Sequence, residues 1–250
     1  MRKAMIGYQV YSAREEAAKD LPSVLRQLKA LGYDGVEFAG FYGYSVREIN
    51  AMLDQTGLAV FSDHVPLARI EEDGERVIEE HQAIGCKYIA VPFLEESQRP
   101  GCPGFAKVLG VIANFGRRCR EAGIQLLYHN HDFEFVTISG MYALDFMYDA
   151  IDAEFLKTEL DTCWVNYSGV EPSGYIRKYA GRTPIIHLKD FVGSRGGAQP
   201  YALINADGSD DGMNSAAASF EFRPVGYGCQ DIPAIVQAGL ESGAFCFVVV

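Results

Sequence analysis

The chain has 250 residues, of which 48% are hydrophobic and 22% are charged, a composition ordinary for a soluble globular protein that excludes a disordered chain. Lys and Arg number 22 against 33 for Asp and Glu, and the resulting net charge of −11 argues against binding to the phosphate backbone of nucleic acids. No stretch reaches the roughly 18 uncharged apolar residues of a membrane span, and the basic start lacks a long apolar core behind it, so we expect a cytoplasmic protein without a signal peptide.

Eight short apolar runs are candidate strands, and most of them follow a glycine. They are rich in Val, Ile, Leu and aromatic residues and do not alternate cleanly with polar residues, which is typical of strands buried on both faces of a parallel sheet. In chain order the predicted strands are Ala4–Val10, Gly35–Phe38, Ala59–Ser62, Tyr88–Val91, Gln125–His129, Leu156–Leu160, Pro184–Leu188 and Phe245–Val250.

Amphipathic segments lie between these runs and predict helices. Leu residues from Leu21 to Leu31 recur at the spacing of one buried helix face, and Gly32 ends that helix. Ser45 is followed three residues later by Glu48, which predicts a capping box at the start of the next helix. Further helices are predicted over 71–84 and 105–122, each ending at a glycine.

Eight strands separated by helices predict an α/β fold, a (β/α)8 TIM barrel, in which residues 1–250 form a single domain. An open doubly wound sheet is the rival fold. It would usually carry a glycine-rich phosphate turn after the first strand, and residues 9–12 read Gln-Val-Tyr-Ser instead. The barrel is therefore the favoured prediction.

Two segments depart from the regular pattern. Residues 193–219 are rich in Gly, Ser, Ala and Asp without periodicity, and we predict a loop or lid there. The sequence also ends in the eighth predicted strand, so the eighth helix is missing from it. We expect the natural chain to continue past Val250 with an acidic residue and then a helix that covers the barrel.

Polar side chains gather at the predicted ends of the strands, where a TIM barrel carries its catalytic residues. Four of the five histidines are among them, whereas His81 falls within a predicted helix. Two imidazoles with two carboxylates suit Mn²⁺, Zn²⁺, Fe²⁺ or Co²⁺ better than Mg²⁺, so we expect a divalent metal ion. The strand-end candidates are Glu37, Asp63, His64, His129, His131, Asp132, Glu134, Asp161, His187, Lys189 and Asp190.

The sequence leaves the roles of some of these residues open. Glu37, beside Phe38, is either a buried acid of the barrel or a simple strand-end charge. Lys189 is a candidate for binding a phosphate, carboxylate or keto oxygen, with an ion pair to Asp190 as the alternative. Trp164, the only tryptophan, is predicted to line the pocket.

At these residues the chain resembles the sugar phosphate isomerase/epimerase superfamily, the xylose-isomerase-like TIM barrels that include inosose dehydratase, hydroxypyruvate isomerase and ketose 3-epimerases. The resemblance spans essentially the whole chain. The stretches that carry it are Gly32-Tyr33-Asp34-Gly35-Val36-Glu37, Tyr128-His129-Asn130-His131-Asp132-Phe133-Glu134-Phe135, Leu160-Asp161-Thr162-Cys163-Trp164-Val165 and His187-Leu188-Lys189-Asp190.

The resemblance implies one divalent metal held by a Glu of strand five, an Asp of strand six, a His of strand seven and a Glu of strand eight. Asp161 and His187 match the middle two positions. His129 stands where the first Glu is usual, and the sequence ends just before the place of the last one. We therefore expect His129, Asp161 and His187 as metal ligands, with Glu134 as an alternative to His129.

The implied chemistry is removal of a proton next to a carbonyl, with Glu134 or His131 as the base. The substrate is expected to be a sugar, sugar phosphate, keto-sugar or cyclitol, and the outcome is isomerisation or epimerisation, with dehydration as the alternative. A homo-oligomer is left open. The residues assigned to substrate binding are His64, Glu37, Lys189 and Trp164.

Two other functional classes are alternatives to a sugar isomerase or epimerase. Departures at two of the four ligand positions are also what a non-catalytic sugar-binding barrel would show. An endonuclease-IV-like phosphodiesterase shares the fold, but such enzymes use a three-zinc cluster and a basic DNA-facing surface. Five histidines and a charge of −11 argue against that class.

Overall fold

Eight parallel strands close into a barrel in the computed structural model, which describes residues 4–193 and 220–250. Consecutive barrel strands pair with each other, and the last one closes on the first. This confirms the predicted (β/α)8 barrel. The barrel strands are β1 (Met5–Gln9), β2 (Gly35–Phe38), β3 (Ala59–His64), β4 (Tyr88–Val91), β5 (Gln125–His129), β8 (Lys157–Asp161), β9 (Ile185–Leu188) and β12 (Cys246–Val249).

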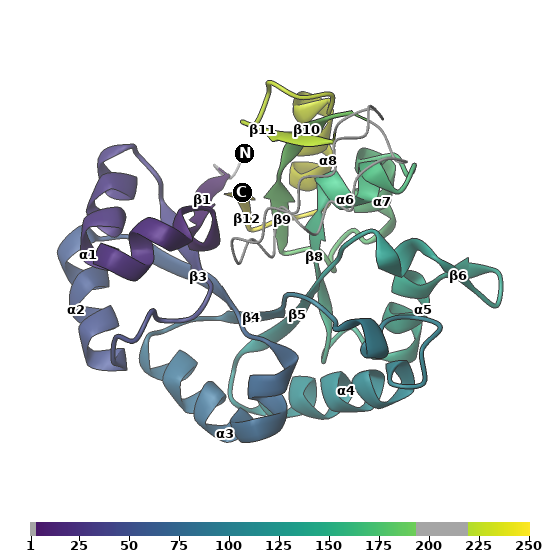
Figure 1. Ribbon diagram of the computed structural model, residues 1–250, viewed down its shortest axis with the longest axis horizontal. Coiled ribbons are helices and arrows are strands. Elements are labelled where there is room, and N and C mark those ends of the chain that lie inside the picture. Colours follow the sequence, from purple (N-terminus) through teal and green to yellow (C-terminus); the bar gives the residue numbers. More distant parts are fainter. Residues whose placement is uncertain (1–3, 194–219) are drawn as a thin grey trace, which may run out of the picture.

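Helices follow the barrel strands and form an arc around them (Figure 1). Two helices, α6 and α7, lie between β8 and β9, where one is usual. The α-helices of the described residues are α1 (Arg14–Ala30), α2 (Val46–Thr56), α3 (Leu67–Ala83), α4 (Phe105–Glu121), α5 (Ala143–Ala150), α6 (Thr162–Tyr167), α7 (Pro172–Lys178) and α8 (Ile232–Glu241).

Short elements occupy the loops at the carboxyl ends of the strands. Single-turn 3-10 helices η1 (Val10–Ala13), η2 (Glu96–Gln98) and η3 (Phe133–Phe135) follow β1, β4 and β5. Two small antiparallel hairpins pair β6 (Thr137–Ile138) with β7 (Met141–Tyr142), and β10 (Asp190–Val192) with β11 (Glu221–Arg223). The loop or lid predicted over 193–219 falls, apart from Gly193, outside the described residues.

The arc of helices has a gap beside β1 and β12. Figure 1 shows β1 and β12 at this gap, between α1 and α8. No helix of the described chain follows β12, which ends one residue before Val250. Ile6 of β1 is 46% exposed, as expected of an apolar strand residue that no described helix covers.

The helix starts follow from local chemistry. Ser45 caps α2, because its hydroxyl accepts from the backbone N–H of Glu48 while the Glu48 carboxylate accepts from the backbone N–H of Ser45. This is the predicted capping box. In α1 and α3 the backbone leaves the helical region at Asp20 and Asp73, and each carboxylate accepts from an N–H three residues later. Each of these segments is thus two short helices, the second with its own aspartate cap.

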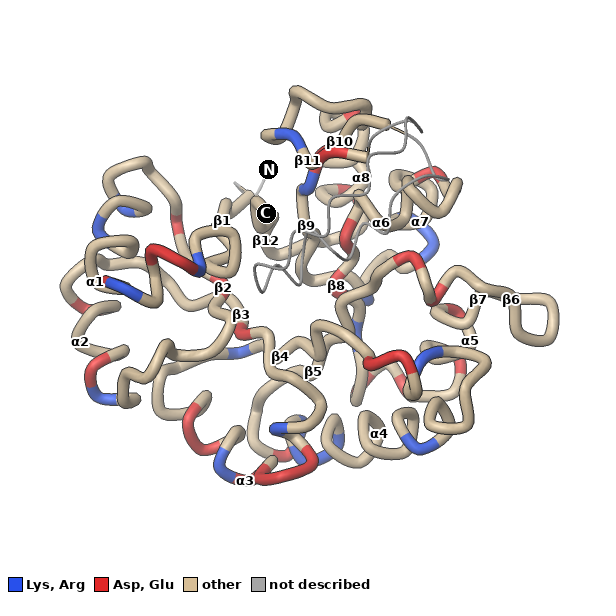
Figure 2. Tube along the Cα trace, viewed as in Figure 1, with Lys and Arg blue, Asp and Glu red and all other residues tan. Residues whose placement is uncertain are grey.

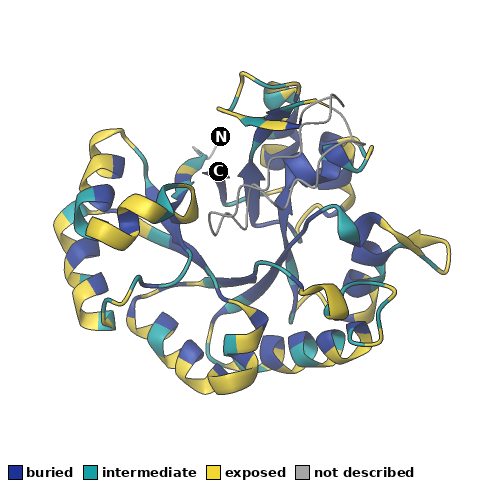
Figure 3. Cartoon of the chain, in the orientation of Figure 1, coloured by how far each residue is buried: buried dark blue, intermediate teal, exposed yellow. Residues whose placement is uncertain are grey.

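The core has two layers, one outside and one inside the barrel. Most buried side chains lie between the strands and the helices, and Figure 3 shows the buried inner helix faces against exposed outer ones. Inside the barrel, Phe61, Leu127, Ile185 and Val248 pack together. In β3, β5 and β9 these apolar residues come before the polar residues at the strand ends. The polar groups therefore lie above the apolar layer, at the carboxyl end of the barrel.

Among the helices, α3 is the most acidic, because Asp and Glu residues follow one another along it (Figure 2). In the part of the chain that the structure describes, no helix has the length and apolar character needed to cross a bilayer.

Candidate metal centre and active site

The carboxyl ends of five strands bring polar side chains together inside the barrel. Residues two apart in a strand face the same side, so Glu159 and Asp161 of β8 both point toward the barrel axis. Strand register places His129 of β5 level with Glu159, and His187 of β9 level with Asp161. The cluster therefore has two layers, an inner one at Glu159 and an outer one, nearer the barrel mouth, at Asp161.

Glu37 of β2 belongs to the inner layer and is completely buried. Its Oε1 accepts from Gln9 Nε2 at 2.7 Å, and its Oε2 accepts from the Ser62 hydroxyl. The same Oε1 lies 2.7 Å from His187 Nε2 and 3.1 Å from His64 Nε2. Burial alone would raise the pKa of Glu37, but His187 and His64 hold it well below its usual range. Of the two predicted alternatives, Glu37 is the buried acid.

Glu159 is the second carboxylate of the inner layer, and it was not among the predicted site residues. Its Oε2 lies 2.6 Å from His64 Nε2, 3.3 Å from His129 Nδ1 and 3.5 Å from His187 Nε2. Burial and the neighbouring Glu37 carboxylate raise the pKa of Glu159. Its position two residues before Asp161 in a strand was the available signal, because that spacing puts both side chains on the inward face.

Asp161 belongs to the outer layer. Its Oδ1 caps α6 by accepting from the N–H groups of Cys163 at 2.9 Å and Trp164 at 3.2 Å. Its Oδ2 lies 3.8 Å from His129 Nε2 and is buried without a hydrogen-bond partner in the described chain. Burial raises the pKa of Asp161 against the opposing effect of Lys189 and His187.

The rings of His129 and His187 lie next to each other inside the barrel, with centroids 4.6 Å apart and planes tilted by 59°. Burial, followed by the nearby His187 and His64 rings, holds the pKa of His129 well below its usual range. Burial would lower the pKa of His187 as well, but Glu37 and Glu159 raise it overall. In both rings Nδ1 is buried and has no hydrogen-bond partner among the described residues.

Two overlapping ligand sets share these two histidines. The inner set comprises His64, His129, Glu159 and His187, with ligand atoms all within 4.8 Å of one another. The outer set is the one predicted from the sequence, His129, Asp161 and His187. Both sets combine imidazole and carboxylate, as Zn²⁺, Mn²⁺, Fe²⁺ and Co²⁺ prefer.

His131 lies at the mouth, beside the cluster. Its ring is 5.1 Å from that of His129, stacks on Phe133 at 5.5 Å and lies 5.2 Å from Trp164, measured between centroids. The residue is 4% exposed. Burial, and then the charge of Lys189, hold the pKa of His131 well below its usual range, so the ring is neutral.

Glu134, the other predicted base, is fully buried. Its Oε1 accepts from the Tyr128 hydroxyl at 2.5 Å, and its Oε2 accepts from the backbone N–H of His131 at 2.8 Å. Burial raises the pKa of Glu134 to about 8, with these two donors opposing the shift. Both oxygens are thus engaged in holding the loop that carries His131.

The residues predicted to bind substrate are spread around the mouth. Lys189 Nζ lies 4.2 Å from the ring centre of Phe222 and 5.5 Å from that of Trp164. Asp190, its alternative partner, instead accepts backbone N–H groups from Phe191, Gly226, Gly228 and Gln230. Trp164 is completely buried in an aromatic cluster with Tyr167 and Phe220. His64 bridges the inner carboxylates.

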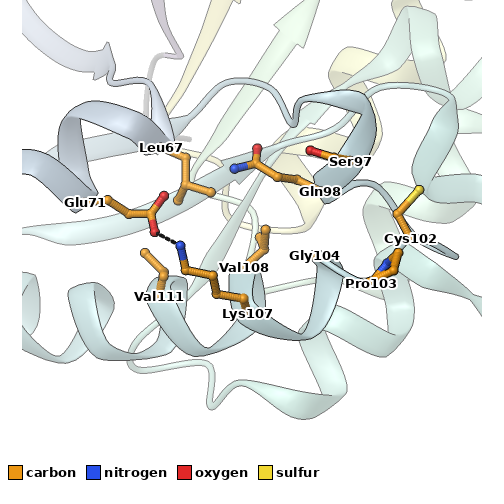
Figure 4. Close-up of a pocket in the computed structure, with 10 residues that line it drawn as sticks. All are labelled: Leu67, Glu71, Ser97, Gln98, Cys102, Pro103, Gly104, Lys107, Val108 and Val111. Atoms are coloured by element: carbon orange, nitrogen blue, oxygen red, sulfur yellow. Dashed lines mark ion pairs between the residues drawn. The ribbon is translucent and has the colours of Figure 1, made fainter.

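A separate groove of about 440 Å³ lies on the outside of the barrel between α3 and α4. Figure 4 shows its walls, where Lys107 of α4 pairs with Glu71 of α3 at 2.6 Å and Cys102 stands at one end. None of the strand-end candidates lines it. This groove is therefore separate from the cluster of strand-end residues.

Comparison with known families matches residues 25–245 to the family described as xylose isomerase-like TIM barrel. The chain belongs to this family. That membership confirms the resemblance to the xylose-isomerase-like TIM barrels inferred from the strand-end motifs.

Among curated proteins, the chain is similar to the inosose dehydratases of Geobacillus kaustophilus and Clostridium beijerinckii. It is 24% identical to the first over 189 residues, which cover 67% of this chain and 61% of that protein. It is 24% identical to the second over 184 residues, covering 66% and 61%. The chain thus spans about three fifths of the length of these relatives.

Solved structures share the fold at lower identity. A sugar phosphate isomerase/epimerase from Parabacteroides distasonis superimposes with a TM-score of 0.74 at 22% identity, over 100% of this chain and 86% of that one. An IolI protein with a bound zinc atom superimposes with a TM-score of 0.70 at 14% identity, over 98% and 88%.

Proposed function

We propose that this protein binds a divalent metal ion at the barrel mouth and removes a proton next to the carbonyl of a keto-sugar or cyclitol, with isomerisation or epimerisation as the outcome. The observation that carries the proposal is the group of buried polar atoms without hydrogen-bond partners in the described chain. They are His129 Nδ1, both ring nitrogens of His187, Glu159 Oε1 and Asp161 Oδ2. Each such atom costs about 1–3 kcal/mol, so five in one place indicate an absent ligand.

His129, Asp161 and His187 would hold the metal. They fit a metal ion because they offer two imidazoles and one carboxylate at the mouth, on the side where substrates of TIM barrels bind. When bound, the ion polarises a carbonyl or a pair of hydroxyl oxygens and stabilises the negative charge that develops on oxygen.

His131 is the base in this proposal. Its ring stands beside His129 at the mouth, and a neutral imidazole has a nitrogen lone pair that accepts a proton. Glu134 remains the alternative base from the sequence, but both of its oxygens already accept hydrogen bonds. We therefore assign Glu134 to holding the His131 loop.

Lys189 supplies a positive charge at the same mouth. A primary ammonium held against the faces of Phe222 and Trp164 is available to a keto oxygen, carboxylate or phosphate of the substrate. The His64 ring is stacked on His187 at 5.4 Å, and because its Nε2 faces Glu159, its Nδ1 is left to accept from a substrate hydroxyl.

Dehydration is the second candidate, and the similarity to inosose dehydratases favours it. The first step is the same proton removal, after which a hydroxyl on the next carbon leaves instead of a proton returning. The residues at the mouth serve either outcome.

Deuterium exchange tests the shared first step. The protein is incubated in D₂O with Mn²⁺ and a panel of keto-sugars and inososes, and substrates and products are followed by NMR and mass spectrometry. Deuterium at the carbon next to the carbonyl, abolished by chelator, supports the proposal, and loss of 18 mass units identifies dehydration. Absence of exchange with every substrate, in protein shown to contain metal, favours the non-catalytic sugar-binding barrel.

A further inference from the structure

We propose that Arg99 binds an anionic group of the substrate, a phosphate or a carboxylate, beside His131 at the barrel mouth. This inference rests on the proposed function and narrows its substrate class, from any keto-sugar or cyclitol to one that carries a negative charge. Arg99 was not among the predicted site residues.

Arg99 lies in the loop that follows β4, at the carboxyl end of the barrel, where it ends the 3-10 helix η2. Loops at this end of a TIM barrel carry the residues that contact substrate. Arg99 is partly buried, whereas Glu95 and Glu96 of the same loop are exposed. The loop thus holds its positive charge against the protein and its negative charges in solvent.

The aromatic contacts of Arg99 place its guanidinium group close to the proposed base. The guanidinium carbon lies 4.4 Å from the ring centre of Phe133 and 5.0 Å from that of Phe93. Both rings also contact His131, Phe133 by stacking at 5.5 Å and Phe93 edge-on at 5.0 Å, measured between centroids. Arg99 is therefore one aromatic ring away from His131.

A hydrogen bond fixes the orientation of the guanidinium group. Its Nε donates to the backbone oxygen of Leu94 at 3.1 Å, so the edge formed by the two Nη groups is directed away from Leu94. That edge has the paired N–H groups that bind two oxygens of a carboxylate or phosphate at once. Because the side chain is already ordered, little conformational freedom is lost when an anion binds.

Lys189 brings a second positive charge to His131 from another strand end. Its Nζ lies 5.5 Å from the ring centre of Trp164, whose ring lies 5.2 Å from that of His131. In a chain with a net charge of −11, two cations around one ring favour anions locally. A substrate with its carbonyl at Lys189 and an anionic group at Arg99 would use both charges, whereas a neutral sugar would use only one.

Isothermal titration calorimetry with three matched sugars tests the proposal. Fructose, fructose 6-phosphate and fructuronate share one carbon skeleton and differ only at C6, which carries a hydroxyl, a phosphate or a carboxylate. We expect one of the charged sugars to bind at least about tenfold more tightly than fructose, as hydrogen bonds to a charged group predict. The tighter of the two identifies the anionic group as phosphate or carboxylate.

Arg99→Gln should weaken binding of that charged sugar about 10- to 100-fold and leave the affinity for fructose within twofold of wild type. Arg117→Gln is the matched control, because Arg117 of α4 also lies over an aromatic ring, Phe155 at 5.2 Å, but on the outside of the barrel. It should leave the preference unchanged. If Arg99→Gln does not fold, Arg99→Lys keeps the charge without the paired N–H groups and should still weaken binding severalfold.

The inference and the proposed function fail in different ways. Charged sugars that bind no more tightly than fructose, or a preference that persists in the folded Arg99 variant, would overturn the inference, whatever the exchange experiment shows. Binding of a charged sugar that depends on Arg99, without deuterium exchange into any of the three sugars, would support the anion site and count against the proposed function alone.

Discussion

Asp161 Oδ2 and His129 Nε2 face each other across β5 and β8 at 3.8 Å, too far for a hydrogen bond and without another partner for the oxygen among the described residues. Two ligands bound to one metal at about 2.1 Å lie roughly 3.0–3.4 Å apart, so a shift of a few tenths of an ångström would let one ion bind both atoms. The proposed metal site therefore requires this pair to approach by a few tenths of an ångström.

Asp161→Asn should remove most of the bound metal. The amide keeps a carbonyl oxygen that can accept from Cys163 and Trp164 and so cap α6, but it lacks the negative charge that favours a divalent ion. Elemental analysis after dialysis measures the metal content. Asp231→Asn, at the cap of α8, is the matched control and should retain metal. An Asp161→Asn protein with wild-type metal content would mean that Asp161 is not a ligand.

His131→Asn should slow deuterium exchange about 10²- to 10⁴-fold, because the ring is the proposed base. Metal content should stay at the wild-type level, since His131 is outside both ligand sets. Glu134→Gln should slow exchange by about tenfold or less, as expected for a residue that only holds the loop. A larger loss in Glu134→Gln than in His131→Asn would make Glu134 the base, as the sequence also allows.

Stability should fall with rising pH because of Glu134. Its pKa is raised to about 8 in the folded protein, above the usual value of 4.5, so between these values the folded state holds a proton that the unfolded state has lost. The free energy of unfolding then decreases as pH rises, by at most about 1.4 kcal/mol per unit, and the effect ends above pH 8. Urea titrations from pH 5 to 8 should show a flatter dependence for Glu134→Gln. Parallel curves for the two proteins would contradict the burial argument.

The fold was predictable because each barrel strand has a recognisable pattern in its own few residues. Gly35–Phe38 and Gln125–His129 were predicted to the residue, since a buried parallel strand is a short apolar run bounded by a turn. The capping box at Ser45 was equally local. The hairpins β6–β7 and β10–β11 were not predicted, because strands of two or three residues carry no periodic signal.

Three residues of the candidate site were expected from the sequence, and their arrangement was not. Strand ends identified His129, Asp161 and His187, because the fold brings the carboxyl ends of all strands to one mouth. Glu159 was missed because it lies inside the strand rather than at its end, and a fully buried Glu is rare. Glu134 Oε1 accepts a hydrogen bond from the Tyr128 hydroxyl. The sequence does not show in which direction the Tyr128 side chain points, so this contact could not be predicted.

Two glycines offer a matched test of packing. A methyl group at Gly35 of β2 would come within 2.5 Å of the backbone oxygen of Ala59, so Gly35→Ala should cost about 1–3 kcal/mol or more of unfolding free energy. Gly110 lies inside α4 with nothing within 4 Å of an added methyl, so Gly110→Ala should stabilise the protein by up to about 1 kcal/mol. Thermal unfolding of both variants measures the contrast. Equal effects would mean that β2 and β3 are not packed as described.

Anomalous diffraction from crystals grown with Mn²⁺ or Zn²⁺ tests the central claim most directly, because it locates the ion without reference to activity. The account predicts one peak at the barrel mouth, within about 2.3 Å of one ring nitrogen of His129, one ring nitrogen of His187 and Asp161 Oδ2. A peak bound to His64 and Glu159 in the inner set, or no peak in the barrel at saturating metal, would contradict it.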